Sequence, residues 1–196
     1  PAKGYKSFGD YFFRQCTDLF PDFGIEAEIE STGEEYEKGS FNKTIKIALD
    51  NADKIQKIYA DLYGEEVAAA SKLPFNVICP KCRKISTTIA IEWDKEKEII
   101  SFECRNDVVK WAKGCGHKGR LKPGKGNVKL PWRVHWAATW YIHGTTFESA
   151  GKDHFAAGGS VETGHTFARE VFKSEPPLQI PTEFLLIDNK KLSGSV

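Results

Sequence analysis

Four of the five cysteines of this 196-residue chain lie in one stretch that is rich in glycine and proline. Cys79 and Cys82 form a Cys-Pro-Lys-Cys knuckle, whose two-residue gap lets both thiolates face one ion. Cys104 and Cys115 supply a second, less regular arm. Four thiolates would close a tetrahedral zinc site without an open position, which is typical of structural zinc. His117 could replace one thiolate or orient the site, and unliganded thiols or a disulfide are the alternatives.

The spacing of apolar residues and helix breakers changes near residue 72. Residues 1–72 carry apolar side chains at helical spacing, and Gly64 supplies a C-terminal stop, so we expect helices. Residues 73–127 contain many helix breakers. Within them, Ser86–Ile91 and Ile99–Glu103 have the composition of two short strands joined by a charged turn. We expect a small β unit there that is cross-linked by its cysteines.

Residues 128–196 alternate between helix and strand patterns. The expected elements are a helix from Pro131 to His143, a strand over 145–148, a glycine-rich loop over 151–159, a helix over 162–172, a strand over 184–188 and a loop over 190–196. This alternation favours a parallel sheet, so the expected fold class is α/β.

Composition excludes some classes of protein. Apolar content of 40% and charged content of 28% are ordinary for a globular chain. The net charge of +1 produces no overall field for nucleic acid, so such a partner would need local patches. No apolar run approaches the ~20 residues that span a bilayer, and there is no secretory signal. We therefore expect a cytoplasmic protein without a membrane partner. The chain starts at Pro1 and lacks methionine, and we interpret it as an internal fragment.

A glycine-rich loop from Gly151 onward suits a nucleotide. Gly158 and Gly159 allow the backbone to approach a base or ribose closely. Asp153 can accept hydrogen bonds from ribose hydroxyls or hold a substrate ammonium, and His154 lies where it would touch substrate. A Gly-Lys-Asp-His stretch by itself is also typical of a simple turn.

A second loop near the C-terminus carries Lys191, Ser193 and Ser195. One point charge with hydroxyl and amide donors suits the phosphates of a nucleoside triphosphate, whose departing charge would need stabilisation in a transfer reaction. Trp132 begins a stripe of tryptophans spaced four residues apart and could form a wall of a substrate pocket. A core-facing role is the alternative for the stripe, and it is favoured for Trp136 and Trp140.

Several ordered stretches over the whole chain resemble one family, the class I lysyl-tRNA synthetases of archaea and some bacteria. The stretches are Tyr36–Asn42, Cys79–Cys82, Gly114–His117, Leu130–Trp136, Gly151–Ser160 and Lys191–Ser195, the last being similar to a KMSKS loop with Leu192 in the Met place. The family's HIGH motif and anticodon-binding domain have no counterpart here, so we expect the isolated chain to be inactive.

The resemblance implies a fold and a reaction. The fold would be the second half of a class I synthetase Rossmann-type nucleotide-binding core. Residues 1–72 would be the helical part of an insertion, 73–127 an inserted zinc ribbon, and 128–196 the C-terminal half of the core, ending in the KMSKS-like loop. The enzyme would be a lysine–tRNA ligase. It would convert L-lysine and ATP to lysyl-adenylate, with Mg²⁺ accompanying ATP, and transfer the lysyl group to tRNA(Lys).

The resemblance also implies site roles. Trp132 and His154 would line the lysine pocket. Residues of the nucleotide-facing loop would bind ATP, namely Gly151, Asp153, His154, Gly158 and Gly159. Residues of the last loop would close on the phosphates as the catalytic set, namely Lys191, Ser193 and Ser195. Structural zinc would be held by Cys79, Cys82, Cys104 and Cys115.

Two alternatives fit the same residues. One is another class I synthetase, specific for glutamate or arginine, which would share the core and the loop. The other is a non-catalytic zinc-ribbon module that binds RNA through a local basic run. This run comprises Lys118, Arg120, Lys122, Lys125 and Lys129.

Overall fold

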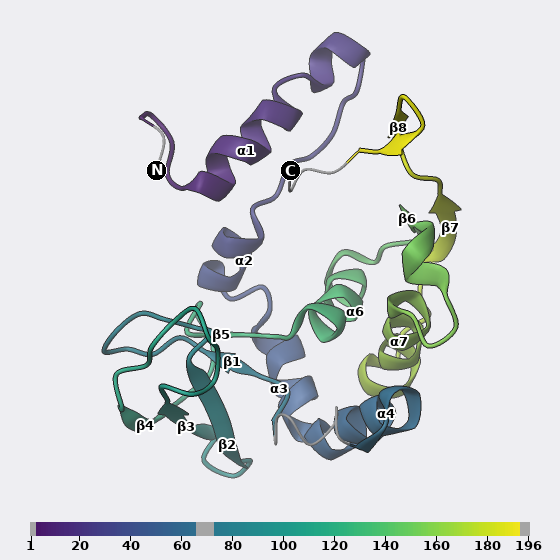
Figure 1. Ribbon diagram of the computed structural model, residues 1–196. Coiled ribbons are helices and arrows are strands. Elements are labelled where there is room, and N and C mark those ends of the chain that lie inside the picture. Colours follow the sequence, from purple (N-terminus) through teal and green to yellow (C-terminus); the bar gives the residue numbers. More distant parts are fainter. Residues whose placement is uncertain (1–2, 66–72, 193–196) are drawn as a thin grey trace. The chain divides into compact units, whose positions relative to one another are not determined.

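The computed structural model describes residues 3–65 and 73–192 (Figure 1). The chain forms two compact units, Pro1–Thr32 and Gly33–Val196, and each is considered by itself. No helix within the described ranges is long and apolar enough to cross a membrane.

The first unit contains one regular helix, α1, over Phe8–Thr17. It begins at Ser7, whose Oγ accepts a hydrogen bond from the backbone N–H of Asp10 at 3.0 Å. A short 3₁₀ helix, η1, follows over Phe20–Phe23 and ends at Gly24, whose φ is 65°. Phe8 and Phe12 are exposed, so the cap rather than burial of these rings defines where α1 begins.

Helix α2, over Thr32–Lys38, has its first residue at the end of the first unit and the rest in the second. It is followed by α3 over Asn42–Asp50 and α4 over Ala52–Tyr63. The apolar pattern predicted helical structure over this stretch, and its side chains are buried as expected, including Ile45 and Ile55. The structure adds a break at Asn51, where the side-chain amide donates to the carbonyl of Ile47 at 2.8 Å. Gly64, with φ 88°, ends α4 as predicted.

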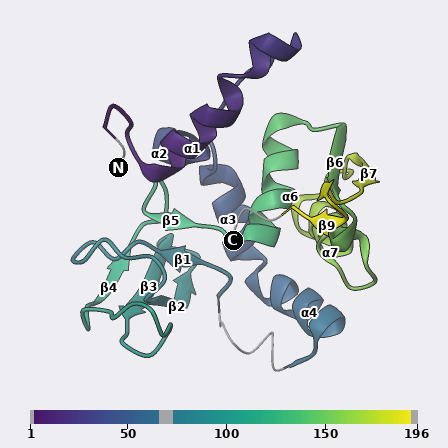
Figure 2. The ribbon, with the colours of Figure 1, turned by 45° about the horizontal axis from the view of Figure 1, so that its top comes forward.

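The β unit lies between residues 76 and 129, and Figure 2 shows its strands together. Its strands are β1 over Asn76–Val77, β2 over Thr88–Asp94, β3 over Ile99–Cys104, β4 over Lys118–Leu121 and β5 over Val128–Lys129. The predicted strand pair is confirmed as β2 and β3, which are antiparallel, with β4 on the other side of β3. The side chains of β3 alternate, so Ile100 and Phe102 are buried. The first and last strands of this segment, β1 and β5, pair with each other and are antiparallel.

The last part of the chain contains a parallel β-α-β unit. Helix α6 covers Trp132–His143 and ends at the left-handed Gly144, as predicted. Strands β6 over Phe147–Gly151 and β7 over Leu178–Thr182 pair in parallel, with α7 over Ser160–Phe167 between them in sequence. The expected strand over 145–148 is shifted toward the C-terminus. The sequence did not predict β7, because prolines precede it and Pro181 lies within it.

Local geometry differs from expectation at three further places. A 3₁₀ helix, η2, occupies Lys152–Phe155 inside the glycine-rich loop. The helix expected over 162–172 is α7 followed by a π-helical turn, η3, over Ala168–Phe172. The hairpin of β8, Leu186–Ile187, and β9, Lys190–Lys191, turns through Asp188 and Asn189, both with positive φ. Lys191 therefore lies on a short strand.

An aromatic cluster joins α2, α3 and α6 inside the second unit. Tyr36 and Phe41 stack with ring centroids 4.2 Å apart, and the His135 ring packs on Phe41 at 4.9 Å. The Tyr36 hydroxyl lies 3.1 Å from His135 Nδ1 and accepts from the N–H of Leu130 at 3.2 Å. Burial raises the pKa of Tyr36 to about 12 and lowers that of His135 to about 4. Both groups are therefore neutral at pH 7, and they hold α2 against α6.

Candidate functional site

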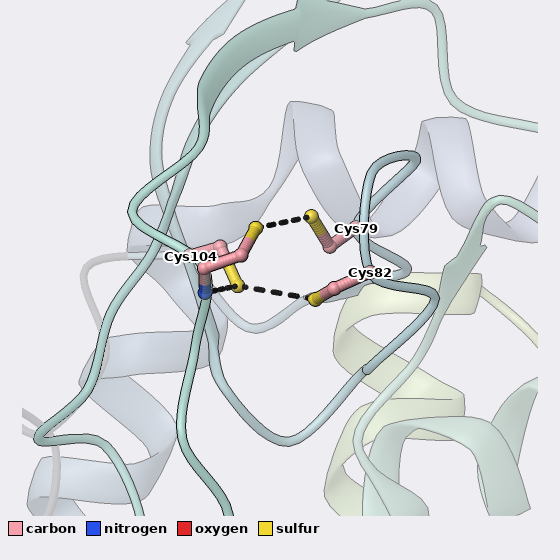
Figure 3. Close-up of side chains that lie close together, drawn as sticks. Cys79, Cys82 and Cys104 are labelled. Atoms are coloured by element: carbon pink, nitrogen blue, oxygen red, sulfur yellow. Dashed lines mark hydrogen bonds between the residues drawn. The ribbon is translucent and has the colours of Figure 1, made fainter.

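The four cysteines of the knuckle and its second arm converge in the β unit. Figure 3 shows the side chains of Cys79, Cys82 and Cys104 pointing toward one another. The Sγ atoms of Cys79 and Cys115 are 3.6 Å apart, and those of Cys82 and Cys104 are 3.7 Å apart. All four sulfurs lie within 4.8 Å of one another. The sequence-predicted set is therefore brought together around one point.

This spacing fits a tetrahedral metal ion. Zinc–thiolate bonds of about 2.3 Å in a tetrahedron place the sulfurs about 3.8 Å apart. The separations of 3.6 Å between Cys79 and Cys115 and of 3.7 Å between Cys82 and Cys104 are close to that value. His117 instead packs edge-on against Phe102, with centroids 5.7 Å apart. The arrangement could hold a metal ion on four sulfurs without His117.

Neighbouring groups favour the thiolate form of Cys104. Burial works against the charged form, but it is outweighed by hydrogen bonds with the Thr87 hydroxyl at 3.3 Å, with the backbone N–H of Cys115 at 3.4 Å and with the thiols of Cys82 and Cys115 taken together. The pKa of the Cys104 thiol is thereby lowered to about 7. Gly114 closes the base of the loop between Cys104 and Cys115, because a Cβ there would lie 2.3 Å from the Arg105 carbonyl oxygen. These neighbours thus favour a thiolate at one of the four positions of the cluster.

A second cluster forms where α6 meets the glycine-rich loop. Trp132 and Trp136 stack with centroids 5.6 Å apart, and the ring of His154 lies edge-on to both, at 5.8 and 6.0 Å. Trp132 is 50% exposed, whereas Trp140 is buried. The structure therefore brings the predicted pocket residues Trp132 and His154 together, and Trp136 packs against both rings.

The loop beside these rings depends on its glycines. A Cβ at Gly159 would lie 2.5 and 2.6 Å from the carbonyl oxygens of Ala156 and His154. Gly158 has φ 70°, and its N–H donates to Glu162 at 2.7 Å. These two glycines therefore turn the chain into α7. Asp153 and the preceding Lys152 are exposed, and Gly151 ends β6 beside them.

Arg133 joins this region without any signal in the sequence pattern. Its guanidinium lies 5.0 Å from the Tyr63 ring centroid and 5.3 Å from that of Trp132. Its Nε donates to Ser160 Oγ at 3.4 Å, at the first residue of α7. Tyr63 also approaches Thr163 on α7, with 2.5 Å between the hydroxyl oxygens. Arg133 therefore places a positive charge beside the exposed Trp132 and the start of α7.

Glu148 on β6 is a further residue that sequence reasoning missed. Its carboxylate accepts from the indole N–H groups of Trp136 and Trp140 and from the side-chain amide of Gln179. The only hint in the sequence was a carboxylate in the expected strand, directly after the tryptophan stripe. Gln179 became its neighbour only through the pairing of β6 with β7.

The last predicted loop is described only in part. Lys191 Nζ lies 3.7 Å above the centroid of the Phe184 ring, and Lys152 Nζ lies 5.0 Å from the same centroid. Lys152 also pairs with Glu183 at 2.5 Å. Two lysines that are distant in sequence thus share one aromatic ring. Ser193 and Ser195 lie outside the described residues.

The basic run of the β unit is partly neutralised. Its ion pairs are Lys118 with Glu103 at 3.0 Å, Arg120 with Asp94 at 3.9 Å and Lys122 with Glu98 at 2.8 Å. Because acidic partners lie so close, the field available to an RNA phosphate is weaker than the sequence suggested. The geometry does not favour the RNA-binding alternative.

Comparison of the sequence with known proteins identifies a family and several relatives. The model of the family described as tRNA synthetases class I (K) matches residues 1–196. The lysine–tRNA ligase of Methanocaldococcus jannaschii is 37% identical over 180 residues, which cover 92% of this chain and 32% of that protein. That of Methanosarcina barkeri strain Fusaro is 35% identical over 195 residues, covering 100% and 34%. That of Archaeoglobus fulgidus is 35% identical over 190 residues, covering 97% and 36%.

The chain belongs to the class I tRNA synthetase family of the K type, which confirms the resemblance found in the sequence. It has the mixed α/β architecture expected for such a chain. The chain spans about a third of the length of the curated relatives it matches.

Proposed function

We propose that the protein carrying this chain is a lysine–tRNA ligase. The names of the relatives from three archaeal genera support this activity. The observation that carries it is the meeting of Trp132 and His154 beside the loop that Gly158 and Gly159 shape. In that arrangement an amino acid can pack against the aromatic rings, and a nucleotide bound next to it can approach the backbone of the glycine loop closely.

The proposed chemistry has two steps. The carboxylate of L-lysine attacks the α-phosphorus of ATP, so a mixed anhydride forms and pyrophosphate leaves. A ribose hydroxyl at the tRNA(Lys) 3′ end then attacks the lysyl carbonyl, and AMP leaves. The enzyme contributes by positioning the reactants and stabilising charge, with no covalent enzyme intermediate.

Each predicted residue has a role in this scheme. Trp132 and His154 orient lysine. The loop residues hold the nucleotide, namely Gly151, Asp153, His154, Gly158 and Gly159. Lys191, Ser193 and Ser195 stabilise the departing pyrophosphate, and Mg²⁺ bound with ATP would neutralise part of the same charge.

We further propose that residues 128–196 are the C-terminal half of a Rossmann-type core that ends in a KMSKS-like loop. The parallel pairing of β6 with β7 around α7 supports this assignment, because nucleotide-binding cores of this type are built from such units. Residues 1–72 would be the helical part of an insertion and residues 73–127 a zinc ribbon within it.

The zinc proposal has its own test, which does not depend on activity. Zinc bound to Cys79, Cys82, Cys104 and Cys115 would cross-link the knuckle to β3 and stabilise the β unit. Elemental analysis of the purified protein should give about one zinc per chain. Cys79→Ser should lose the metal and lower the melting temperature. Cys16→Ser, which changes an exposed cysteine outside the cluster, is the matched control. Zinc-free protein of unchanged stability would refute the ribbon.

The activity is tested by ATP–pyrophosphate exchange on the complete gene product that carries this chain. Exchange should depend on lysine and be absent with glutamate or arginine. His154→Ala should raise the KM for lysine, whereas Lys191→Ala should mainly lower kcat. Exchange with glutamate or arginine alone would preserve the adenylation chemistry and overturn the lysine specificity. Absence of exchange with all three would overturn the proposed function.

A further inference from the structure

The Glu148 carboxylate is the centre of a hydrogen-bond network that the proposed mechanism does not use. Trp136 Nε1 donates to both of its oxygens, at 3.0 Å each. Trp140 Nε1 donates to Oε2 at 2.8 Å, and Gln179 Nε2 donates to Oε2 at 2.9 Å. His165 Nε2 in turn donates to Gln179 Oε1 at 2.7 Å. Residues of α6, β6, α7 and β7 are thereby linked through one side chain.

The network is specific for a carboxylate. Glu148 is only partly exposed, and no arginine, lysine or histidine forms an ion pair with it in the part of the chain that the structure describes. Three N–H donors, none of them charged, are directed at it instead. Hydrogen bonds to a charged acceptor are stronger than those to a neutral one. The carboxylate therefore fixes the orientation of the two indoles and of the Gln179 side chain. An amide in this place would turn an NH₂ group toward at least one of the donors.

One of the three donors is in contact with the proposed lysine pocket. The Trp136 ring stacks on Trp132 and lies edge-on to His154. Trp140, by contrast, packs on Trp136 and on His165, at 5.1 and 5.8 Å. Because an indole that is held by its N–H cannot rotate about χ2, fixing Trp136 also fixes the surface against which Trp132 and His154 rest.

We propose that Glu148 is a positioning residue for the lysine pocket, acting through the indole N–H of Trp136. This inference rests on the proposed function, since it takes Trp132 and His154 to contact lysine. Glu148 itself does not touch the substrate. Its effect should therefore fall mainly on the binding of lysine, which uses both Trp132 and His154, and only weakly on the binding of ATP, which uses His154 alone of the two.

The test is a double-mutant cycle on the complete gene product, measured by lysine-dependent ATP–pyrophosphate exchange. Glu148→Gln should raise the KM for lysine by roughly tenfold, which corresponds to one lost hydrogen bond to a charged group. The KM for ATP should stay within about twofold of wild type, because ATP shares only His154 with the lysine pocket. Trp136→Phe keeps an aromatic ring but lacks the N–H. It should raise the KM for lysine similarly, and Glu148→Gln should add little to it.

Trp140→Phe is the matched control, because Trp140 donates to the same carboxylate but does not contact Trp132 or His154 in the described ring packing. In that background Glu148→Gln should retain its full effect on the KM for lysine. Thermal unfolding of every variant separates positioning from loss of fold. If Glu148→Gln does not fold, Trp136→Phe alone decides the proposal. It should raise the KM for lysine more than the KM for ATP.

Three results would overturn the inference while leaving the proposed function intact. The first is an unchanged KM for lysine in Glu148→Gln. The second is an equal rise in both KM values. The third is a full effect of Glu148→Gln in the Trp136→Phe background, which would indicate direct contact with the substrate. A wild-type protein without lysine-dependent exchange would instead refute the proposed function itself.

Discussion

Protonation of His135 should destabilise the protein between pH 6.5 and pH 4. Burial, with a smaller contribution from Lys129, lowers the pKa of this imidazole to about 4 from its ordinary value of 6.5. Between pH 6.5 and pH 4, His135 is therefore protonated in the unfolded chain and neutral in the folded chain. Stability from the neutral ring is fully present above pH 6.5 and is lost as the pH falls through the folded pKa. The neighbouring Tyr36 hydroxyl accepts from Leu130, so its proton points at Nδ1 and opposes protonation there.

The size of the effect follows from the two pKa values. Each pKa unit corresponds to about 1.4 kcal/mol, so the complete shift is worth roughly 3 kcal/mol. Between pH 7 and pH 5, which avoids most carboxylate titration, the free energy of unfolding should fall by about 2 kcal/mol through this group. His135→Gln keeps an acceptor for the Tyr36 hydroxyl and does not titrate, so it should lose this part of the pH dependence.

The assay is urea denaturation at pH 7 and pH 5, followed by tryptophan fluorescence. The measured quantity is the change in unfolding free energy between the two pH values, compared between wild type and His135→Gln. Subtraction removes the titration of all other groups, including the cysteine cluster. A difference below about 0.5 kcal/mol between wild type and His135→Gln would refute the reasoning, since that is the usual error of such comparisons.

Three other changes test the fold and the loop. Gly159→Ala would place a Cβ 2.5 and 2.6 Å from two carbonyl oxygens, so lysine-dependent exchange should fall by roughly tenfold or more, while Gly9→Ala in α1 should have no effect; equal activity of the two variants would contradict the close approach. Phe102 is 2% exposed, so Phe102→Ala should leave a cavity in the core and lower the free energy of unfolding by about 3–5 kcal/mol. A loss below about 1 kcal/mol would show that the surrounding side chains close the cavity. Ser7→Ala removes the α1 cap, so amide exchange over α1 should quicken by a factor corresponding to about 1 kcal/mol, and unchanged exchange would show that the cap contributes nothing.

Local patterns in the sequence predicted several elements well. The helical period of apolar residues gave α3 and α4, and glycines marked the ends of α4 and α6. The cysteine spacing predicted a cluster whose sulfurs do converge. These features depend on neighbours within a few residues, so a linear sequence contains them.

Other features escaped sequence reasoning because their causes are distant in the chain. β7 contains Pro181 and was missed, and it is a strand because its backbone pairs with β6. Asn51 divides a helical run through a side-chain hydrogen bond that periodicity does not reveal. Arg133 gave no signal, since its aromatic neighbour Tyr63 comes from another helix.

The sequence by itself determined the family, the cysteine set and the positions where only glycine fits, because each depends on residue type and local spacing. The tertiary structure alone decided which side chains meet. The parallel register of β6 and β7 places Gln179 beside Glu148, and the packing of α6 on the loop brings His154 to Trp132. The reason is physical: strand register and helix packing are chosen by the total burial and hydrogen bonding of distant segments, which no short stretch of sequence encodes.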